Sequence, residues 1–448
     1  MTLHTIELTG RLLTPAHSDY DAARVVFNTM IDKRPAVIAQ CETAADVATA
    51  IRHARERDLE IAVRGGGHSV AGNALTDGGL VVDLRRMNTV AVDPVAKTAR
   101  VGGGATMAHL DRATQPFDLA TTGGRVSTTG VGGFALGGGS GWIDRKFGLA
   151  CDNLVSVELV TADGTSVTAS ADEHPELFWA LHGGGGNFGV ATSMTFRLHD
   201  VPTMTAALLV FDPEQGEQVI RAFRDAIEHG PDELGGGVLY GTGPEEEFVP
   251  EHLQGRLVLL LVVTFVGTEE QARPHLRPIL AHDPAGRMIV ELPYAELNCM
   301  LDDPPDYRNY WSAEHLAGLP DAAIAAFESA VDGMIVPSAS QHVLFPEGGA
   351  VGRAGTEYPV PWRTAPWVAH PFALWSDPAD DDRARDWTRA VRSAMRPWAT
   401  GNVYLNFIGD EGPDRTRAGY GAAWDRLVAV KRAFDPDNVF RLNHNITP

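Results

Sequence analysis

The sequence predicts an α+β protein with more than one domain. Its 448 residues are about three times the ~150 residues of an ordinary domain. Glycine-rich loops are concentrated before residue 190, where short strand-like runs alternate with a helix-like segment. After residue 203, long strand-like runs alternate with helices, and the content of Pro, Trp and Glu rises. We therefore expect a domain boundary near Val201.

The first domain, residues 1–202, is expected to combine short strands with helices. Residues 45–57 carry an apolar stripe at helical spacing, and residues 60–63 follow as a short strand. Further strand-like runs occupy 80–84, 90–93 and 155–161. This mixture is typical of an α+β nucleotide-binding domain.

The second domain, residues 203–400, is expected to be an antiparallel sheet covered on one face by helices. Three long apolar runs predict strands at 204–211, 256–265 and 367–375. Amphipathic segments predict helices at 213–229, 269–281 and 383–395. The remaining segment, residues 401–448, contains an expected helix at 420–434 that ends before Asp435-Pro436-Asp437-Asn438.

Composition excludes several classes of protein. The chain is 44% hydrophobic and 21% charged, and it has no apolar run near the ~20 residues of a transmembrane helix. The net charge of −21 argues against a nucleic-acid partner. Cys41, Cys151 and Cys299 are too widely spaced for a zinc site or a disulfide framework, so no metal is expected. The first residues lack the pattern of a signal peptide, and we expect a cytoplasmic protein.

The glycine loops do not form a nicotinamide-binding fingerprint. Gly184–Gly189 satisfies G-x-G-x-x-G, but a helix-like segment precedes it and a strand-like segment follows it. The Rossmann mechanism needs the opposite order, because the pyrophosphate must meet a helix N-terminus. Glycine still lets backbone N–H groups approach an anionic ligand closely. One such loop alone is better explained as a tight turn, whereas the whole set suggests a large phosphate-bearing cofactor.

Five segments together resemble the FAD-linked oxidases of the vanillyl-alcohol oxidase superfamily, in particular the bacterial type of the berberine-bridge-enzyme-like group. They are 64–69 (RGGGHS), 124–141 (GRVSTTGVGGFALGGGSG), 179–190 (WALHGGGGNFGV), 404–407 (YLNF) and 440–446 (FRLNHNI). The resemblance implies a two-part FAD-binding domain of the PCMH type, a substrate domain, and a C-terminal segment that returns to the FAD-binding domain.

The resemblance also implies covalent FAD. His68 stands where the family joins a histidine to the flavin 8α-methyl carbon; the alternative is an ordinary turn histidine. Val126 stands where many relatives attach the flavin through a cysteine, so we expect one covalent link and not two. The residues expected to bind FAD are Arg64, Gly65, Gly66, Gly67, His68, Ser69, Gly72, Val126, Thr129, Gly130, Gly133, Gly138, Gly139, Gly189, Val190, Tyr404, Asn406, Asn443 and Asn445.

Catalysis is expected to involve Tyr404, Asn406 and Thr129. Oxidation of an alcohol carbon needs a base for the hydroxyl proton, and the resemblance gives this role to Tyr404, with Asn406 on the same face of a strand. The alternative is that Tyr404 is only an aromatic wall. Thr129 stands beside the expected reacting edge of the flavin, or it caps its own loop.

The expected reaction is FAD-dependent oxidation of an alcohol, hydroxy or phenolic substrate, with O₂ as acceptor and H₂O₂ as product. Three alternatives stay open: an oxygenating flavoenzyme, a dehydrogenase with another acceptor, and a flavin-binding protein without turnover. The expected partners are a small-molecule substrate and O₂, in a monomer or homodimer. Candidate substrate residues are Tyr310, Trp311, His370 and Trp375, together with Tyr307 and His342, although core packing explains aromatic residues equally well.

Overall fold

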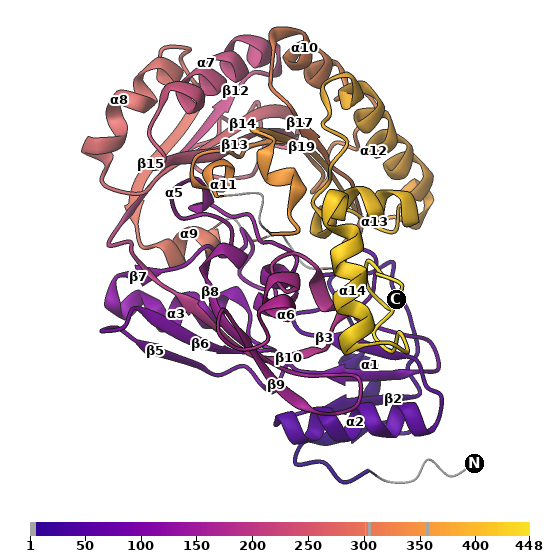
Figure 1. The fold of residues 1–448 in the computed structure, drawn as a ribbon. Coiled ribbons are helices and arrows are strands. Elements are labelled where there is room, and N and C mark those ends of the chain that lie inside the picture. The colour runs from indigo at the N-terminus through magenta and orange to yellow at the C-terminus, as the bar shows by residue number, and fades with distance from the viewer. Residues whose placement is uncertain (1–5, 301, 303–305, 355–357) are drawn as a thin grey trace.

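The computed structural model describes residues 6–300, 302, 306–354 and 358–448. It is an α+β fold in two lobes, as the sequence predicts (Figure 1). The strands before residue 201 belong to the first lobe, and the strands between residues 204 and 375 belong to the second. The chain then returns to the first lobe, so that both termini lie at the same end of the molecule (Figure 1).

The first lobe contains three separate sheets. In the four-stranded sheet, β1-β2-β4-β3, the pairs β2–β4 and β3–β4 are parallel, and β1 is antiparallel to β2. The five-stranded sheet, β5-β6-β10-β8-β9, is antiparallel throughout. The strands are β1 (Arg11–Leu13), β2 (Val37–Gln40), β3 (Ile61–Arg64), β4 (Leu80–Asp83), β5 (Val90–Asp93), β6 (Thr98–Gly102), β8 (Leu154–Val160), β9 (Ser166–Ser170) and β10 (Val190–Arg197). A third, two-stranded antiparallel sheet of this lobe pairs β7 (Leu119–Ala120) with β11 (His199–Asp200).

Helices of the first lobe are mostly short. The longest, α2 (Ala44–Glu56), starts where the Thr43 hydroxyl accepts a hydrogen bond from the Asp46 N–H (3.1 Å), and the Asp46 carboxylate accepts one from the Thr43 N–H (3.2 Å). Its apolar face covers the four-stranded sheet. The other helices are α1 (Tyr20–Ala23), α3 (Met107–Thr114), α4 (Val131–Leu136), α5 (Asp144–Phe147) and α6 (Pro175–Ala180).

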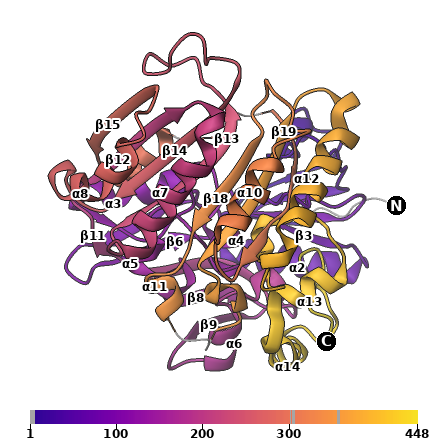
Figure 2. The ribbon, with the colours of Figure 1, turned by 90° about the horizontal axis from the view of Figure 1, so that it is seen from above.

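The second lobe is one large antiparallel sheet in the order β15-β12-β14-β13-β18-β19-β16, with β17 paired to β19. Long helices cover its outer face (Figures 1 and 2), which confirms the sequence-based prediction. The strands are β12 (Met204–Phe211), β13 (Leu234–Thr242), β14 (Leu257–Phe265), β15 (Gly286–Leu292), β16 (Arg308–Trp311), β17 (Glu314–Leu316), β18 (Gln341–Pro346) and β19 (Trp367–Trp375). The helices are α7 (Gly216–His229), α8 (Glu269–Leu280), α9 (Tyr294–Met300), α10 (Asp321–Ser329), α11 (Ala350–Arg353) and α12 (Asp381–Met395).

The predicted elements of this lobe match closely. The strands predicted at 204–211 and 367–375 have those bounds, and β14 starts one residue after the predicted 256. The segment 213–229 opens with a 3₁₀ turn, Pro213–Gln215, before α7 begins. The expected single helix at 420–434 is wrong in one respect: α13 (Pro413–Tyr420) ends at Tyr420, and a 3₁₀ turn separates it from α14 (Trp424–Phe434).

The C-terminal segment docks on the first lobe through buried polar contacts. Lys431 of α14 donates to the carbonyl oxygens of Asn187 (2.7 Å) and Phe440 (2.9 Å) and pairs with Asp435 (2.6 Å). The Asn187 side-chain oxygen accepts a bond from the Ile446 N–H (2.9 Å). These contacts hold the last residues of the chain against the Gly183–Gly189 loop.

Among the described residues, no helix is both long and apolar enough to cross a membrane.

Candidate active site

A cavity of about 820 Å³ lies between the two lobes. The first lobe lines it with the glycine loops around residues 65–69, 124–137 and 183–189. The sheet of the second lobe contributes mainly apolar side chains, including Leu239, Leu260, Val262, Phe345 and Phe372. The C-terminal segment adds residues 404–408 and 442–444. Its size and mixed lining suit a large ligand with one polar and one apolar end.

Two glycine loops touch at the cavity wall. A Cβ on Gly66 would lie 2.3 Å from the backbone N of Gly130, so neither position tolerates a side chain. Gly67 adopts a positive φ of 79°, which glycine accommodates without strain. Arg64 lies behind this loop, where its guanidinium donates to the carbonyl oxygens of Ala23 (2.6 Å) and Val25. Arg64 therefore fixes the loop and does not face the cavity.

His68 lines the cavity as a neutral imidazole. Its Nε2 lies 2.8 Å from the Thr128 hydroxyl oxygen, and its ring stacks on Phe27 with centroids 4.3 Å apart. Burial lowers the pKa of His68 to about 4. Nδ1 has no hydrogen-bond partner among the described residues. The ring is therefore positioned through Nε2, and the tautomer in which Nε2 donates to Thr128 leaves on Nδ1 the lone pair that a nucleophile requires.

Val126 and Thr129 also line the cavity. Among the described residues, none of the three cysteines does so: Cys41 and Cys151 are buried elsewhere and Cys299 is exposed. A second covalent link through cysteine has no candidate in this arrangement.

Tyr404 lies at the cavity wall, but not on a strand as the sequence suggested. Residues 405–407 form a 3₁₀ turn, so period-two spacing does not apply. Tyr404 and Asn406 meet nevertheless: the Tyr404 hydroxyl accepts bonds from the Asn406 side-chain amide (2.9 Å) and from the Gly139 N–H (3.0 Å). Asn406 also donates to the Gly133 (3.3 Å) and Phe134 (3.2 Å) carbonyls at the end of α4. Burial raises the pKa of Tyr404 above its usual value.

The FAD-binding residues expected from the sequence divide into two groups. Most line the cavity, namely Gly65, Gly66, Gly67, His68, Ser69, Val126, Thr129, Gly130, Gly133, Gly189, Tyr404, Asn406 and Asn443. The others are not among the lining residues, namely Arg64, Gly72, Gly138, Gly139, Val190 and Asn445. The side-chain oxygens of Asn443 and Asn445 are buried with no hydrogen-bond partner among the described residues. Such orphaned acceptors next to glycine loops fit a bound cofactor that donates hydrogen bonds.

Of the expected substrate residues, only Trp311 lines the cavity. Tyr307 and Tyr310 lie outside its lining. His342 stacks on Phe327 on the helix side of the sheet (3.7 Å). His370 is buried behind Phe407, with its Nδ1 2.7 Å from the Ser312 carbonyl oxygen.

The assignment of Trp375 to the substrate site is corrected. Its indole N–H donates to Asp381 of α12 (2.9 Å), and its ring belongs to the core between sheet and helices. His370 and Trp375 are five residues apart on β19, so a strand places them on opposite faces. Phe372 of the same strand is the residue that reaches the cavity.

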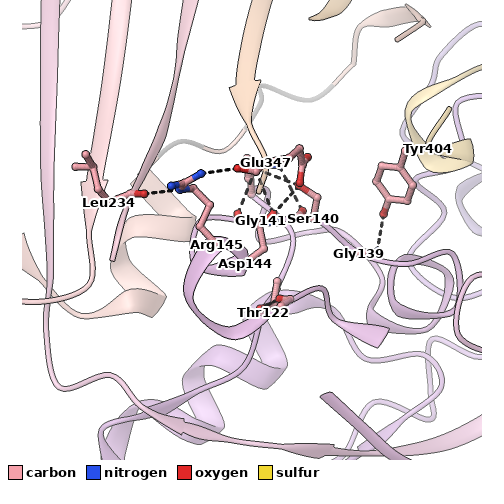
Figure 3. Close-up of polar contacts among 12 residues, drawn as sticks. Thr122, Gly139, Ser140, Gly141, Asp144, Arg145, Leu234, Glu347 and Tyr404 are labelled. Carbon is pink, nitrogen blue, oxygen red and sulfur yellow. Dashed lines mark hydrogen bonds and ion pairs between the residues drawn. The ribbon is translucent and has the colours of Figure 1, made fainter. Parts of the chain in front are cut away.

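Sequence reasoning missed a buried polar cluster at one end of the cavity (Figure 3). Arg125, Ser140 and Asp144 come from the first lobe, and Glu347 follows β18 of the second. The Ser140 hydroxyl lies 2.8 Å from Asp144 Oδ2 and 3.1 Å from Glu347 Oε1. The Arg125 guanidinium lies over the Phe345 ring at 4.1 Å. The sequence contained one signal of this cluster, because the carboxylate of Glu347 stands between the end of β18 and the Gly348-Gly349 turn.

Comparison with known proteins identifies the family. Residues 35–170 match the FAD binding domain model, and residues 403–447 match the model described as berberine and berberine like. The chain is 32% identical to (R)-6-hydroxynicotine oxidase of Paenarthrobacter nicotinovorans, covering 99% of this chain and 98% of that protein. It is 29% identical to an uncharacterized FAD-linked oxidoreductase of Bacillus subtilis, covering 99% and 98%.

Solved structures agree. The structure of 6-hydroxy-D-nicotine oxidase from Arthrobacter nicotinovorans superposes with a TM-score of 0.87 at 28% identity, covering 99% of both chains. A berberine-bridge-enzyme-like protein of Physcomitrella patens gives a TM-score of 0.88 at 27% identity, covering 98% of this chain and 97% of that one. The chain therefore belongs to the FAD-linked oxidoreductases of the berberine-bridge-enzyme-like group, with a PCMH-type FAD-binding domain.

Proposed function

We propose that this FAD-linked oxidoreductase is an oxidase that removes a hydride from an alcohol, hydroxy or phenolic substrate and transfers the electrons to O₂, giving H₂O₂. The observation that carries the proposal is Tyr404, which lines the cavity and whose hydroxyl accepts two hydrogen bonds. The similarity to a protein named (R)-6-hydroxynicotine oxidase supports an oxidase.

The residues present fit FAD. The Gly65–Ser69 and Gly130 loops offer backbone N–H groups to its phosphates, and Asn443 offers an unpaired acceptor. FAD supplies the hydride acceptor and the electron path to O₂. His68 is the proposed point of single covalent attachment, because its neutral ring lines the cavity with Nδ1 unpaired.

Tyr404 is the proposed base for the substrate hydroxyl proton. Burial alone disfavours its phenolate. The donors on Asn406 and Gly139 act in the opposite direction without cancelling the effect of burial, because a phenolate accepts their hydrogen bonds more strongly than a phenol does. A substrate that places its hydroxyl against Tyr404 gives up its proton there as the C–H bond breaks. The competing proposal is that Tyr404 only shapes the wall by packing on Trp362, 4.5 Å between ring centroids.

Thr129 bears on the second half of the reaction. Its backbone oxygen accepts a bond from the Met107 N–H (2.9 Å), and the residue lines the cavity. The Thr129 hydroxyl would either donate a hydrogen bond to an oxygen species beside the flavin or form a hydrogen bond only within its own loop. The oxygenating reaction and the use of a different electron acceptor are therefore the second candidates.

The experiment combines a substrate screen with rapid mixing. Substrates that reduce the flavin without air are identified first, and the reduced protein is then mixed with O₂ while H₂O₂ is measured. One equivalent of H₂O₂ per turnover is expected. Oxygen incorporated into the product would favour the oxygenating alternative, and slow reoxidation by air would favour a different acceptor.

The base is tested with Tyr404→Phe, which removes one oxygen and keeps the ring. Flavin reduction without air is expected to slow by roughly 10²-fold or more, with the flavin spectrum unchanged. Tyr20→Phe is the matched control, since Tyr20 is a buried tyrosine of the first lobe whose hydroxyl donates to the Pro35 carbonyl (2.6 Å). A slowing of less than about threefold in Tyr404→Phe would assign Tyr404 to the wall.

A further inference from the structure

The cavity has one cationic side chain in its wall. Among the described lining residues, Arg125 is the only arginine or lysine. Its guanidinium carbon lies 4.1 Å from the Phe345 ring centroid and 5.1 Å from that of Trp142, and both rings also line the cavity. Leu239 and Val262 continue the apolar surface beside them. The wall thus presents a positive charge inside an aromatic and aliphatic enclosure.

The hydrogen bonding of Arg125 is incomplete. A guanidinium carries five N–H groups. The protein uses three of them at long distances: Nη1 to the Ser140 carbonyl (3.4 Å), and Nη2 to the Ser140 hydroxyl and the Gly141 carbonyl (3.2 Å each). Nε has no partner among the described residues. The nearest carboxylate oxygen, on Asp144, is 3.9 Å away, beyond hydrogen-bond distance.

A second carboxyl next to Arg125 carries its own proton. Ser140 has one hydroxyl proton but touches two carboxyl groups, Asp144 (2.8 Å) and Glu347 (3.1 Å). One of these contacts therefore needs a proton from the carboxyl side. Asp144 also accepts the Gly141 N–H (2.9 Å), whereas Glu347 is 1% exposed and its other oxygen has no partner. Of the two carboxyl groups, Glu347 has fewer hydrogen-bond donors around it and is therefore the better holder of the extra proton.

We propose that the Arg125 end of the cavity is a subsite for an oxyanion of the substrate, a carboxylate or phenolate oxygen attached to an apolar body, and that a neutral Glu347 keeps Arg125 available to it. The inference rests on the proposed function, since it specifies the substrate class of the same cavity. The aromatic rings around Arg125 receive the apolar body, and the guanidinium receives the charge.

The charges around Glu347 give the subsite a pH dependence. Glu347 lies near Asp144 and Arg145 across the lobe boundary (Figure 3), and the charge of Arg125 also acts on it. Arg145 differs from Arg125 in that each of its three nitrogens donates to a carbonyl oxygen, those of Leu234 (2.8 Å), Ile227 (3.2 Å) and Glu347. Burial, and then the charge of Asp144, raises the pKa of Glu347 to about 8. Burial raises the pKa of Asp144 as well, so Arg125 faces fewer carboxylate charges below about pH 8 and both carboxylates above it.

Benzoate binding to the flavin-loaded protein tests the subsite without turnover. Calorimetry at pH 6.5 is expected to show benzoate binding at least about tenfold tighter than the neutral isostere benzamide. Arg125→Gln is expected to remove that preference. Arg389→Gln, which changes an exposed arginine on α12, is expected to keep it. Pentafluorophenol, ionised at this pH, replaces benzoate in a parallel titration to distinguish a phenolate site from a carboxylate site.

Glu347→Gln provides the second arm, because it keeps a neutral donor toward Ser140 at every pH. In the wild type, benzoate affinity is expected to fall above pH 8, approaching tenfold per pH unit. In Glu347→Gln the affinity is expected to stay flat from pH 6.5 to 9.5. The proposal is overturned if Arg125→Gln binds benzoate as the wild type does, if benzamide binds as tightly as benzoate, or if the variant and wild type share one pH profile. These results do not depend on H₂O₂ release or on Tyr404, so failure here is distinct from failure of the proposed oxidase function.

Discussion

At the scale of single residues, burial shifts the pKa values of His68 and Tyr404 and so determines their protonation states. Burial keeps His68 neutral, since its pKa of about 4 lies well below physiological pH. The same effect raises the pKa of Tyr404, which must be offset by hydrogen-bond donors before the residue acts as a base. Burial therefore favours the neutral His68 that the proposed covalent attachment requires. It disfavours the Tyr404 phenolate that the proposed proton abstraction requires.

His68→Ala tests the covalent link. The wild type is expected to retain yellow flavin after acid or detergent denaturation, and the variant is expected to release it. Mass spectrometry of the wild type should find a single flavin-bearing peptide, containing His68. Val95→Ala, which shortens an exposed side chain of the same lobe, serves as the control. Flavin that washes out of the denatured wild type, or a flavin–cysteine adduct, would contradict the single histidine link.

At the scale of elements, the C-terminal segment acts as a clamp on the cofactor loops. Its α14 buries Lys431 against Asp435, and both side chains are fully buried. Asp435 in turn accepts the N–H groups of Val439 (2.8 Å) and Phe440 (2.9 Å), just before the cavity-lining residues 442–444. The charge pair therefore shapes the turn that delivers Asn443 to the cavity.

Lys431→Met removes one partner of this buried pair and leaves Asp435 uncompensated. Such losses cost about 3–5 kcal/mol, so the urea midpoint should fall clearly. Arg426→Gln breaks the exposed pair of the same helix with Glu176 (2.7 Å) and should change the free energy of unfolding by less than about 1 kcal/mol. Equal effects of the two substitutions would show that the Lys431 pair does not anchor the segment.

The sequence predicted the elements better than it predicted the directions of side chains. The apolar run 204–211 has the length of a buried strand and is shorter than a typical helix, so the strand bounds agree. The Tyr404-Leu405-Asn406 stretch has no periodicity long enough to distinguish a strand from a 3₁₀ turn, and the structure shows the turn. Trp375 was misplaced although the spacing from His370 already put it on the opposite face.

The polar cluster could not have been assembled from the sequence. Arg125 and Glu347 are far apart along the chain, and they meet only because the two lobes pack together. Arg125 lies inside the segment 124–141, but the resemblance does not depend on its charge. Glu347 lies outside all five segments that carry the resemblance. Tertiary packing alone decides that Ser140 lies between two carboxyl groups.

At the scale of the whole molecule, the lobes share one hydrophobic core. Phe134 and Trp142 of the first lobe belong to the same buried cluster as Val262 and Phe345 of the second. The Arg125–Asp144–Glu347 cluster lies at this boundary (Figure 3). Its protonation is therefore coupled both to the cavity and to the packing of one lobe on the other.

Glu347→Gln is expected to change how the stability of the whole protein depends on pH. An unfolded glutamate releases its proton near pH 4.3, whereas folded Glu347 holds it until about pH 8. The unfolded wild type thus binds fewer protons across this window, so its stability should fall as pH rises from about 4.3 to 8, and this contribution should then level off. Gln does not titrate, so the variant does not lose this stability. Over the same pH window its free energy of unfolding should therefore rise relative to that of the wild type by a few kcal/mol, and its unfolding temperature should rise accordingly. Differential scanning at intervals from pH 5 to 9 measures this gap, with the exposed Glu56→Gln as the matched control. A gap that stays constant over this range would mean that Glu347 is ionised in the folded protein at all of these pH values.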